Sequence, residues 1–379
     1  MSTVRPIPDG PEGLTPEWLT AALTDSGVLR RGRVTEARWQ RVGQDYGFTG
    51  VIGRVRLRYR DASGAVPASL IAKLPMATDE AVSGYRRMQE REAERLARYY
   101  ARCEREVRFY RELPTAFAPS SYYAAVDGER RRLVVLLEDV SEGRQGDVLD
   151  GCSVADAELV IDRIAPFHAR WWGDRAPTTR FPRLGPDPQA RQERYASQVG
   201  NFMAQFGSRV PPGILSLVER LRSRLAAVAG GLESRYQALI HADLHLDNMI
   251  FDSLGSGRPV TVLDWQTVSV GSPAWDVAMF LSGSLSIADR RAAEPDLFER
   301  YATHLSAHGV DGYSVEDLRL EYRLALLVLL AGVVNWLSAL DPKDATSRER
   351  VLQQDALAPE SRLVAALSDH DAEALLSEL

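Results

Sequence analysis

The sequence predicts an α+β protein of two lobes: a small lobe of antiparallel strands with a helix (residues 1–140), then a larger, mainly helical lobe (residues 141–379). Three observations support this prediction. Apolar and polar residues alternate along several segments of the first region, as they do in half-buried strands. One long segment of the same region is highly charged, poor in Gly and Pro, and spaced like a helix. After residue 140 nearly all long segments have helical spacing, and the chain is long enough to form two such lobes.

The first lobe is expected to begin with a short helix and three strands. Thr15 is a good N-cap, Pro16 suits the first helical position, and Gly27 is typical of a helix end. The segments "VTEARWQRVG", "GVIGRVRLRYRD" and "PASLIAKL" then alternate apolar and polar residues. This alternation predicts an antiparallel meander of about three strands.

A helix and a hairpin complete the first lobe. Residues 78–113 are highly charged and have apolar residues at helical spacing, with a break expected near Gly84. In "SSYYAAVDGERRRLVVLLEDV", Asp127 and Gly128 form a hairpin turn between two apolar-rich runs. We therefore expect a five-stranded sheet with a helix, and a hinge near residues 138–141 that leads into the second lobe.

The second lobe is expected to be helical. The segments "SVADAELVIDRIAPFHARWWG" and "GILSLVERLRSRLAAVAGG", and the chain after Pro273, have helical spacing, interrupted only by two strands around "LIHADLHLDNMIF". The longest apolar run, residues 324–334, is short of the roughly 20 residues that span a bilayer. We therefore expect a buried helix there and no membrane span.

Composition limits the partners. The chain has 46 Lys and Arg residues against 52 Asp and Glu, a net charge of −6, so no basic field favours binding to nucleic acid or to an anionic membrane. The two cysteines lie far apart without metal or redox spacing, and the first residues lack the features of a secretory signal. We expect a cytoplasmic protein.

Residues 239–251, "LIHADLHLDNMIF", place two His, two Asp and one Asn inside an otherwise apolar segment. Buried polar groups are costly unless they are paired, so the pattern indicates either a solvated turn or chemistry. A Gly/Pro turn and a second short strand, "VTVLDWQ", follow, and this hairpin would bring Asn248 and Asp264 side by side, with Asp243 nearby. Amide and carboxylate oxygens suit Mg²⁺, and a free carboxylate can accept a proton from a hydroxyl.

The spacing of these residues is that of protein kinases, in which a catalytic Asp is followed after four residues by Asn and later by an Asp that holds magnesium. Two features depart from that pattern. Ala242 stands where protein kinases have Arg, and Asp264 is followed by "WQ" rather than "FG". Because no downstream segment resembles "APE" either, a protein kinase is disfavoured.

Five motifs in order resemble those of one family: "CEREVRFYREL", "LLEDV", "APFHARWWG", "LIHADLHLDNMIF" and "VLDWQTVSVGSPAWDVAMFL". From about residue 14 to about residue 285, the chain is similar to the aminoglycoside phosphotransferase and choline kinase-like enzymes, most closely to their ecdysteroid-kinase-like branch. The resemblance implies a bilobal, protein-kinase-like α+β fold. It also implies Mg²⁺-dependent transfer of the γ-phosphate of ATP, or of GTP, to a hydroxyl of a small metabolite or antibiotic.

The resemblance also implies residue roles. Asp243 would be the catalytic base, and Asn248 and Asp264 would hold Mg²⁺. Lys73, on the third strand, would reach the nucleotide phosphates, and Glu106 would pair with Lys73 and hold it in place.

Other parts of the implied nucleotide site have weaker signals. Glu104 is an alternative partner for the lysine, but it lies on a different helix face and outside the matching "EVRFY". Glu138 and Val140 would belong to the hinge whose backbone meets the base. Gly43 and Gly47, in "GQDYGFTG", would help to cover the phosphates through backbone N–H groups.

The remaining polar residues of these motifs have simpler interpretations. His241 and His245 have the spacing of two zinc ligands on a helix, but their segment is predicted as strand and turn. We expect His241 to fix the loop by hydrogen bonds. His168 is expected to be a core histidine on a helix, and Asp276 to accept backbone donors and support the catalytic loop.

The acceptor is less constrained. From Gly271 to the end the chain has 9 Lys and Arg residues against 18 Asp and Glu. An acidic wall would suit a cationic acceptor, although a solvated helical surface is the simpler explanation. The alternative to an enzyme is a nucleotide-binding pseudokinase or regulatory scaffold, which has no need of all five residues of the predicted site.

Overall fold

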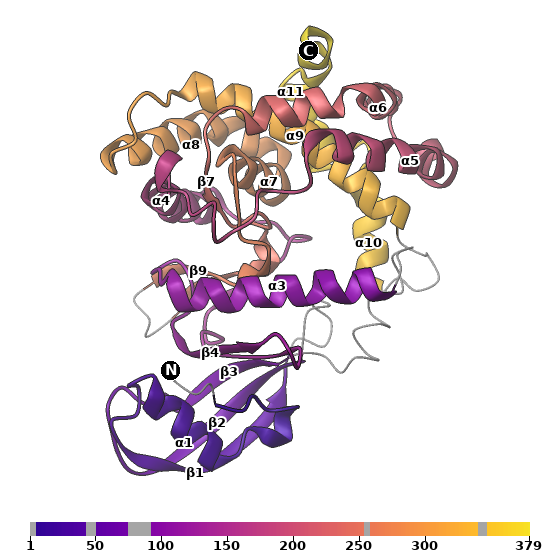
Figure 1. The fold of residues 1–379 in the computed structure, drawn as a ribbon. Coiled ribbons are helices and arrows are strands. Elements are labelled where there is room, and N and C mark those ends of the chain that lie inside the picture. Colours follow the sequence, from indigo (N-terminus) through magenta and orange to yellow (C-terminus); the bar gives the residue numbers. More distant parts are fainter. Residues whose placement is uncertain (1–4, 43–50, 75–91, 254–257, 340–346) are drawn as a thin grey trace. The chain divides into compact units, whose positions relative to one another are not determined.

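The computed structural model describes residues 5–42, 51–74, 92–253, 258–339 and 347–379 (Figure 1). The chain forms two compact units. The first comprises Met1–Arg144 and Asp252–Thr267, and the second comprises Gln145–Phe251 and Val268–Leu379. The first unit therefore includes a stretch that the sequence-based division at residue 140 places in the second lobe.

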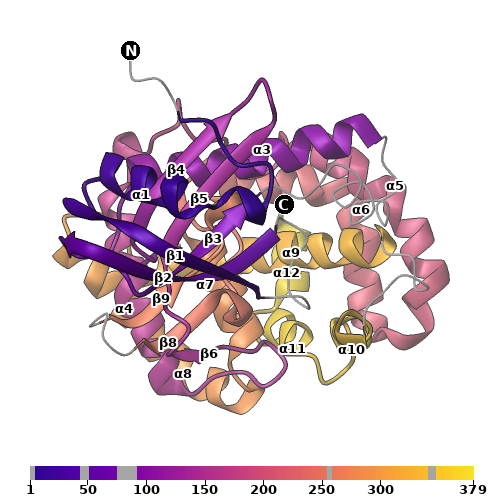
Figure 2. The ribbon, with the colours of Figure 1, turned by 90° about the horizontal axis from the view of Figure 1, so that it is seen from below.

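The first unit is built on a five-stranded antiparallel sheet with the strand order β1-β2-β3-β5-β4 (Figure 2). Its strands are β1 (Arg31–Arg41), β2 (Val51–Ser63), β3 (Ser69–Leu74), β4 (Ser121–Asp127) and β5 (Arg132–Glu138). β3 lies between β2 and β5, where Lys73 is opposite Ile52 on one side and Val135 on the other. The expected five-stranded sheet is confirmed.

Among the described residues, two α-helices accompany this sheet. In α1 (Pro16–Asp25), the Thr15 side chain accepts a hydrogen bond from the Trp18 N–H at 3.2 Å, as expected for an N-cap. The buried face of this helix, including Leu19 and Leu23, joins the apolar core formed with the sheet. α3 (Glu92–Glu112) confirms the long charged helix, whereas the break expected near Gly84 lies outside the described residues.

The first unit also contains β9 (Arg258–Val262) and the short 3-10 helix η5 (Trp265–Thr267). Trp265 is fully buried, and its ring stacks on Phe109 of α3 with centroids 4.0 Å apart. The Val262 N–H donates to the Phe117 carbonyl at 2.8 Å. These contacts explain why this stretch belongs with the strands of the first unit.

The second unit is mainly helical, as expected. Its helices are α4 (Val154–Arg170), α5 (Pro188–Phe206), α6 (Pro212–Glu233), α7 (Ala274–Ser284), α8 (Ile287–Ala307), α9 (Val315–Ala339), α10 (Ser347–Asp355), α11 (Arg362–Asp369) and α12 (Ala372–Glu378). α5 and α6 pack against α9, and α4 packs against α8. Short 3-10 turns occur at Gly173–Arg175, Gly207–Arg209 and Leu246–Asn248.

The expectation of only two strands beyond residue 140 was wrong. Short strands occur at β6 (Arg144–Gln145), β7 (Ala238–Ile240), β8 (Met249–Ser253), β9 and β10 (Ser269–Gly271), and β7 pairs antiparallel with β10. Strands of two or three residues are too short to show a periodic pattern in the sequence. Because β7 ends at Ile240 and β8 begins at Met249, the segment 239–251 consists of two strands separated by a loop.

α9 contains the long apolar run. At 25 residues, it is long and apolar enough to cross a membrane by length and composition, and it is the one such helix among the described residues. However, 67% of its most apolar window is buried inside the protein. This burial agrees with the expectation of a core helix.

Candidate active site

The site residues expected from the sequence fall into two groups, one in each unit. In the first unit, the Lys73 ammonium lies 2.6 Å from Glu106 Oε2 and 2.9 Å from Asp264 Oδ1. Lys73 is 5% exposed and Glu106 is 2% exposed, so this ion pair is removed from solvent. The partner of Lys73 on α3 is therefore Glu106, the residue chosen over Glu104.

Three elements hold this group of charges. Lys73 is fixed by pairing of β3 on both sides, and Glu106 by the buried face of α3. Asp264 follows β9 in a left-handed backbone conformation with φ 59°, which non-glycine residues adopt rarely. The Gln266 amide donates to Asp264 Oδ2 at 2.8 Å, so both carboxylate oxygens of Asp264 are held in place.

The surroundings keep Lys73 charged. Burial by itself would lower the pKa of Lys73, but the nearby carboxylates of Asp264 and Glu106 raise that pKa well above its ordinary value. Lys73 is therefore a buried, fixed cation, the kind of group that attracts phosphate oxygens. Close by in α3, burial raises the pKa of the Cys103 thiol to about 12. Neither Cys103 nor the half-buried Cys152 forms a disulfide bond.

The expected hinge residues are held by local contacts in the first unit. The Glu138 carboxylate accepts hydrogen bonds from the Ser120 N–H at 3.0 Å and from Arg258. Burial alone would raise the pKa of Glu138, but these hydrogen bonds lower it below the ordinary value. Val140 is buried, and its carbonyl accepts from the Gly143 N–H at 3.2 Å. The expected phosphate-covering residues, Gly43 and Gly47, lie outside the described residues.

Asp139 lies within the expected hinge, but its hydrogen-bond partners were not predicted from the sequence. Asp139 accepts hydrogen bonds from Arg54 of β2 and from Ser69 at the start of β3, each at 2.7 Å, and also from Ser141. These contacts tie the hinge to two strands of the sheet. Only the position of Asp139 inside "LLEDV" could have drawn attention to it, because Arg54 lies 85 residues away in the chain.

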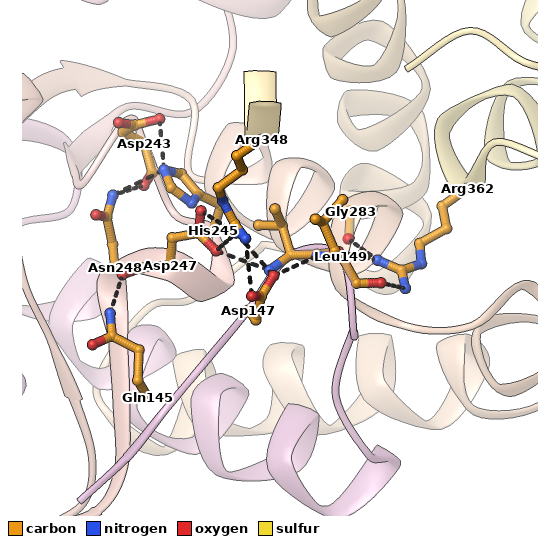
Figure 3. A network of polar contacts seen from close by, with 11 residues as sticks. Gln145, Asp147, Leu149, Asp243, His245, Asp247, Asn248, Gly283, Arg348 and Arg362 are labelled. Carbon is orange, nitrogen blue, oxygen red and sulfur yellow. Dashed lines mark hydrogen bonds and ion pairs between the residues drawn. The ribbon is translucent and has the colours of Figure 1, made fainter. Parts of the chain in front are cut away.

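In the second unit, the loop after β7 brings Asp243 and Asn248 together (Figure 3). The Asn248 side-chain nitrogen donates to the Asp243 carbonyl at 3.0 Å and lies 3.1 Å from His245 Nε2. His245 Nε2 lies 3.6 Å from Asp243 Oδ1, and the Asp243 side chain is 36% exposed. Asp243 therefore presents a solvent-accessible carboxylate on a loop that is fixed by its own side chains.

Asp276, in the first turn of α7, supports this loop through hydrogen bonds to its backbone. Its carboxylate accepts from the His241 N–H at 2.7 Å and from the Ala242 N–H at 2.9 Å. Ala242 has φ 67°, a conformation that needs such support. The fully buried His168 lies 3.3 Å from Asp276 Oδ2 and 2.7 Å from the Tyr301 hydroxyl. The expected roles of Asp276 as loop support and of His168 as a core residue are confirmed.

The donor chemistry of the expected metal ligands fits magnesium. Mg²⁺ prefers hard oxygen ligands, and Asp264 offers a carboxylate. The Asn248 amide nitrogen makes its contacts within the loop, and the amide oxygen is the atom of a type that Mg²⁺ prefers. Asn248 and Asp264 belong to different units, so the fit to magnesium rests on the donor type of each side chain and not on a distance between them.

A further set of residues beside the loop has no recognisable signal in the sequence. Arg348 of α10 forms hydrogen bonds with the carboxylates of Asp147 and Asp247 (Figure 3). Asp247 directly precedes Asn248. The arginine lies 101 residues from Asp247 and 201 residues from Asp147, so no local pattern connects them.

Solved structures of other proteins are similar to this chain. A candidate aminoglycoside phosphotransferase from Ralstonia eutropha is 14% identical, with 94% of this chain and 99% of that chain covered and a TM-score of 0.52. A choline kinase from Streptococcus pneumoniae is 15% identical, covering 88% and 95% of the two chains with a TM-score of 0.48. A macrolide 2'-phosphotransferase from Brachybacterium faecium is 18% identical, covering 92% and 99%, with a TM-score of 0.46.

The similarity to the Ralstonia protein, together with the small antiparallel sheet and the helical second unit, confirms the predicted kinase-like α+β fold. Among curated protein sequences, no match to this chain was found. The assignment to an ecdysteroid-kinase-like branch stays a prediction. A family model described as the phosphotransferase enzyme family matches residues 68–317, well over half of the sequence. The chain belongs to the phosphotransferase enzyme family.

Proposed function

We propose that this phosphotransferase moves the γ-phosphate of ATP, or of GTP, to a hydroxyl of a small molecule, with Mg²⁺ as cofactor and Asp243 as catalytic base. The observation that carries the proposal is the buried ion pair of Lys73 and Glu106 with Asp264, in a chain whose second unit presents Asp243 and Asn248 from one loop. Phosphoryl transfer needs chiefly positioned charges, because the protein has little covalent chemistry to perform.

In this proposal Lys73 binds phosphate oxygens of the nucleotide, and Glu106 keeps its ammonium in place. The Asp243 carboxylate accepts the proton of the acceptor hydroxyl while the hydroxyl oxygen forms its bond to the γ-phosphorus. The bond from that phosphorus to the bridging oxygen breaks, and the nucleoside diphosphate leaves with the bond's electron pair. Mg²⁺, when bound through Asn248 and Asp264, would neutralise charge on the phosphates.

Further parts of the proposal concern the nucleotide and the compartment. Residues 138–140 would meet the base through their backbone, and the contacts of Glu138 and Asp139 support a fixed hinge there. Gly43 and Gly47 would cover the phosphates. We also propose a cytoplasmic location, which agrees with two cysteines that form no disulfide bond.

The acidic excess of the C-terminal part does not require a cationic acceptor. Several carboxylates of the acidic C-terminal part are already paired with arginines inside the second unit: Glu294 with Arg290, Asp317 with Arg235, and Asp369 with Arg290 and Arg291. These pairs account for part of the acidic excess without a cationic substrate. The proposed acceptor is therefore a hydroxylated small molecule, cationic or neutral.

The test is a transfer assay with a panel of acceptors. Purified protein is incubated with Mg-ATP or Mg-GTP and with cationic and neutral hydroxylated molecules, and mass spectrometry detects products heavier by one phosphate. Asp243→Asn should abolish the product while calorimetry shows retained nucleotide binding. Asp296→Asn, which changes an exposed carboxylate of α8, is the matched control and should leave the rate unchanged.

Two outcomes would contradict the proposal. An unchanged rate in Asp243→Asn would exclude Asp243 as the catalytic base. Tight nucleotide binding without product from any acceptor would favour the alternative, a nucleotide-binding regulatory scaffold.

A further inference from the structure

Arg348 contacts the loop that carries Asp243 and Asn248. It lies outside the part of the chain that matches the family model. It lies on α10, beyond residue 317, where that match ends. Its guanidinium donates to Asp147 Oδ2 at 2.9 Å and Oδ1 at 2.8 Å, and to both Asp247 oxygens at 2.8 Å (Figure 3). One arginine thus binds two carboxylates that lie 100 residues apart in the chain.

Asp247 connects Arg348 with Asn248 and Asp243, the two residues of the loop that have proposed chemical roles. It precedes Asn248, whose side chain donates to the Asp243 carbonyl at 3.0 Å. The Asp247 carbonyl accepts from the Gln145 amide at 2.9 Å, and its carboxylate also accepts from the Val148 N–H at 2.9 Å. The loop from Asp243 to Asn248 is therefore fixed at its far end by contacts to Asp247.

Asp147 belongs to a segment that is itself anchored. Arg362 of α11 donates to the Val148 carbonyl at 2.6 Å and to the Leu149 carbonyl at 3.3 Å. It also donates to the Gly283 carbonyl, near the end of α7, at 2.9 Å. Arg348 therefore connects a segment that is held against two helices with the loop that carries Asp243.

The charge of Arg348 also stabilises the arrangement of the two carboxylates that it binds. The Asp147 and Asp247 carboxylates contact the same guanidinium nitrogen, so without Arg348 two like charges would face each other at short range. Hydrogen bonds between ions are about twice as strong as neutral ones, and the planar fork of arginine fixes direction as well as distance. The side chains of Arg348 and Asp247 are only 20% and 13% exposed, which limits screening by solvent.

We propose that Arg348 is a positioning residue that sets the geometry of the catalytic loop through Asp247. The helix α10, which carries Arg348, thereby contributes to the active site. The proposal rests on the proposed function for its effect on turnover. The anchoring of the loop does not depend on that function and can be measured separately.

The first measurement is hydrogen–deuterium exchange of the full-length protein without nucleotide. In Arg348→Met, amides of residues 241–249 should exchange at least several-fold faster than in the wild type. Arg350→Met, which changes an exposed arginine of the same helix, should leave these amides unchanged. Arg348→Lys keeps the charge but not the fork, and it should give an intermediate rate.

The second measurement is turnover of Mg-ATP, with water or an identified hydroxyl acceptor taking the phosphate. Arg348→Met should lower kcat by about 10- to 100-fold, the usual effect of losing a partner that orients catalytic ligands. The KM for ATP should change little, because Lys73 and Glu106 lie in the other unit. Arg348→Lys should recover part of kcat, which a purely structural role would not require.

The outcomes are separable. Unchanged exchange in residues 241–249 of Arg348→Met overturns the inference, whatever the activity. Faster exchange with an unchanged kcat overturns the positioning role. A wild-type protein that neither transfers nor hydrolyses a phosphate contradicts the proposed function, while the exchange data still decide whether Arg348 anchors the loop. If Arg348→Met fails to fold, Arg348→Lys and Asp147→Asn serve the same comparisons.

Discussion

Lys73 keeps its charge in a buried position because two carboxylates face it from different elements. An unpaired ammonium in this position would be strongly destabilising. Glu106 is even more fully buried than Lys73, whereas the Asp264 side chain is 26% exposed. In the proposed mechanism, Glu106 therefore still holds Lys73 while Asp264 binds Mg²⁺, so substitution of Glu106 tests how Lys73 is held.

Glu106→Gln is expected to lower the free energy of unfolding by about 1–3 kcal/mol, because Lys73 retains only Asp264 as an anionic partner. Nucleotide affinity should also fall, since the ammonium is no longer held from α3. Urea denaturation and calorimetry with Mg-ATP measure the two effects. Glu104→Gln is the matched control on the same helix, and equal damage from that variant would contradict the assignment of Glu106.

At the scale of single residues, the sequence predicted those site residues whose partners also lie in recognisable motifs. Glu106 was preferred to Glu104 because it lies in the matching "EVRFY", and residues two apart on a helix point to different faces, so only one of the two was expected to face Lys73. The role of Arg348 was not predictable, because its two carboxylate partners lie 101 and 201 residues away in the chain. The residues around it, including "ERVLQQD", form no motif that would indicate such contacts.

At the scale of elements, α7 and the loop after β7 act together. Asp276 is fully buried, and it accepts two consecutive N–H groups of the loop. Hydrogen bonds to a charged group contribute more than neutral ones, and a buried donor left without a partner is costly. The start of α7 is therefore a support on which the positions of Ala242 and Asp243 depend.

Asp276→Asn is expected to destabilise the protein by about 1.5–3 kcal/mol, because one acceptor oxygen is replaced by an NH₂ group that faces a donor. Turnover should fall further than nucleotide affinity, since Asp243 lies next to the loosened backbone. Denaturation and steady-state kinetics check both effects. A variant that keeps wild-type kcat would show that the loop does not need Asp276.

Helices of eight or more residues with clear periodicity, such as α4 and α6, were predictable from spacing. β6, β7 and β10 were not, because two or three residues cannot show alternation and their pairing is decided by distant partners. The pairing of β7 with β10 sets the start of the catalytic loop, so the loop's residues were predictable while its exact path was not.

At the scale of the whole molecule, one buried acid is expected to shape the pH dependence of stability. Burial raises the pKa of Glu321, on α9, to about 7. Its carboxyl group accepts from the Tyr313 hydroxyl at 2.9 Å and from the Tyr236 N–H at 3.3 Å, and Arg235 lies 3.8 Å away. The unfolded chain loses this proton near pH 4.5, whereas the folded chain keeps it until about pH 7.

Because the folded state binds the extra proton between these two values, the stability contribution of Glu321 is full below pH 4.5 and is lost as the pH rises through 7. The corresponding loss is roughly 3 kcal/mol. Glu321→Gln should remove this part of the slope when the free energy of unfolding is measured from pH 5 to pH 8. Identical slopes in the two proteins would show that Glu321 does not titrate in this range.

The overall architecture was predictable because the change from alternating to helical spacing near residue 140 runs over long segments. The membership of residues 252–267 in the first unit was not, since it depends on Trp265 stacking against Phe109, more than 150 residues earlier. Stacking of this kind follows from three-dimensional packing and leaves no periodic trace in the sequence.

The burial of Cys103 has a practical consequence for following motion in this protein. A thiol whose pKa is raised to about 12 is almost never ionised at neutral pH, and the thiolate is the form that reacts with alkylating reagents. Because Cys103 is also buried, we expect its alkylation to require opening of the first unit, so that the rate of alkylation would report that opening. Cys152 lies in the second unit and is only half-buried, so it can be blocked beforehand in the folded protein. The natural chain thus carries its own kinetic reporter, and no cysteine has to be added or removed to use it.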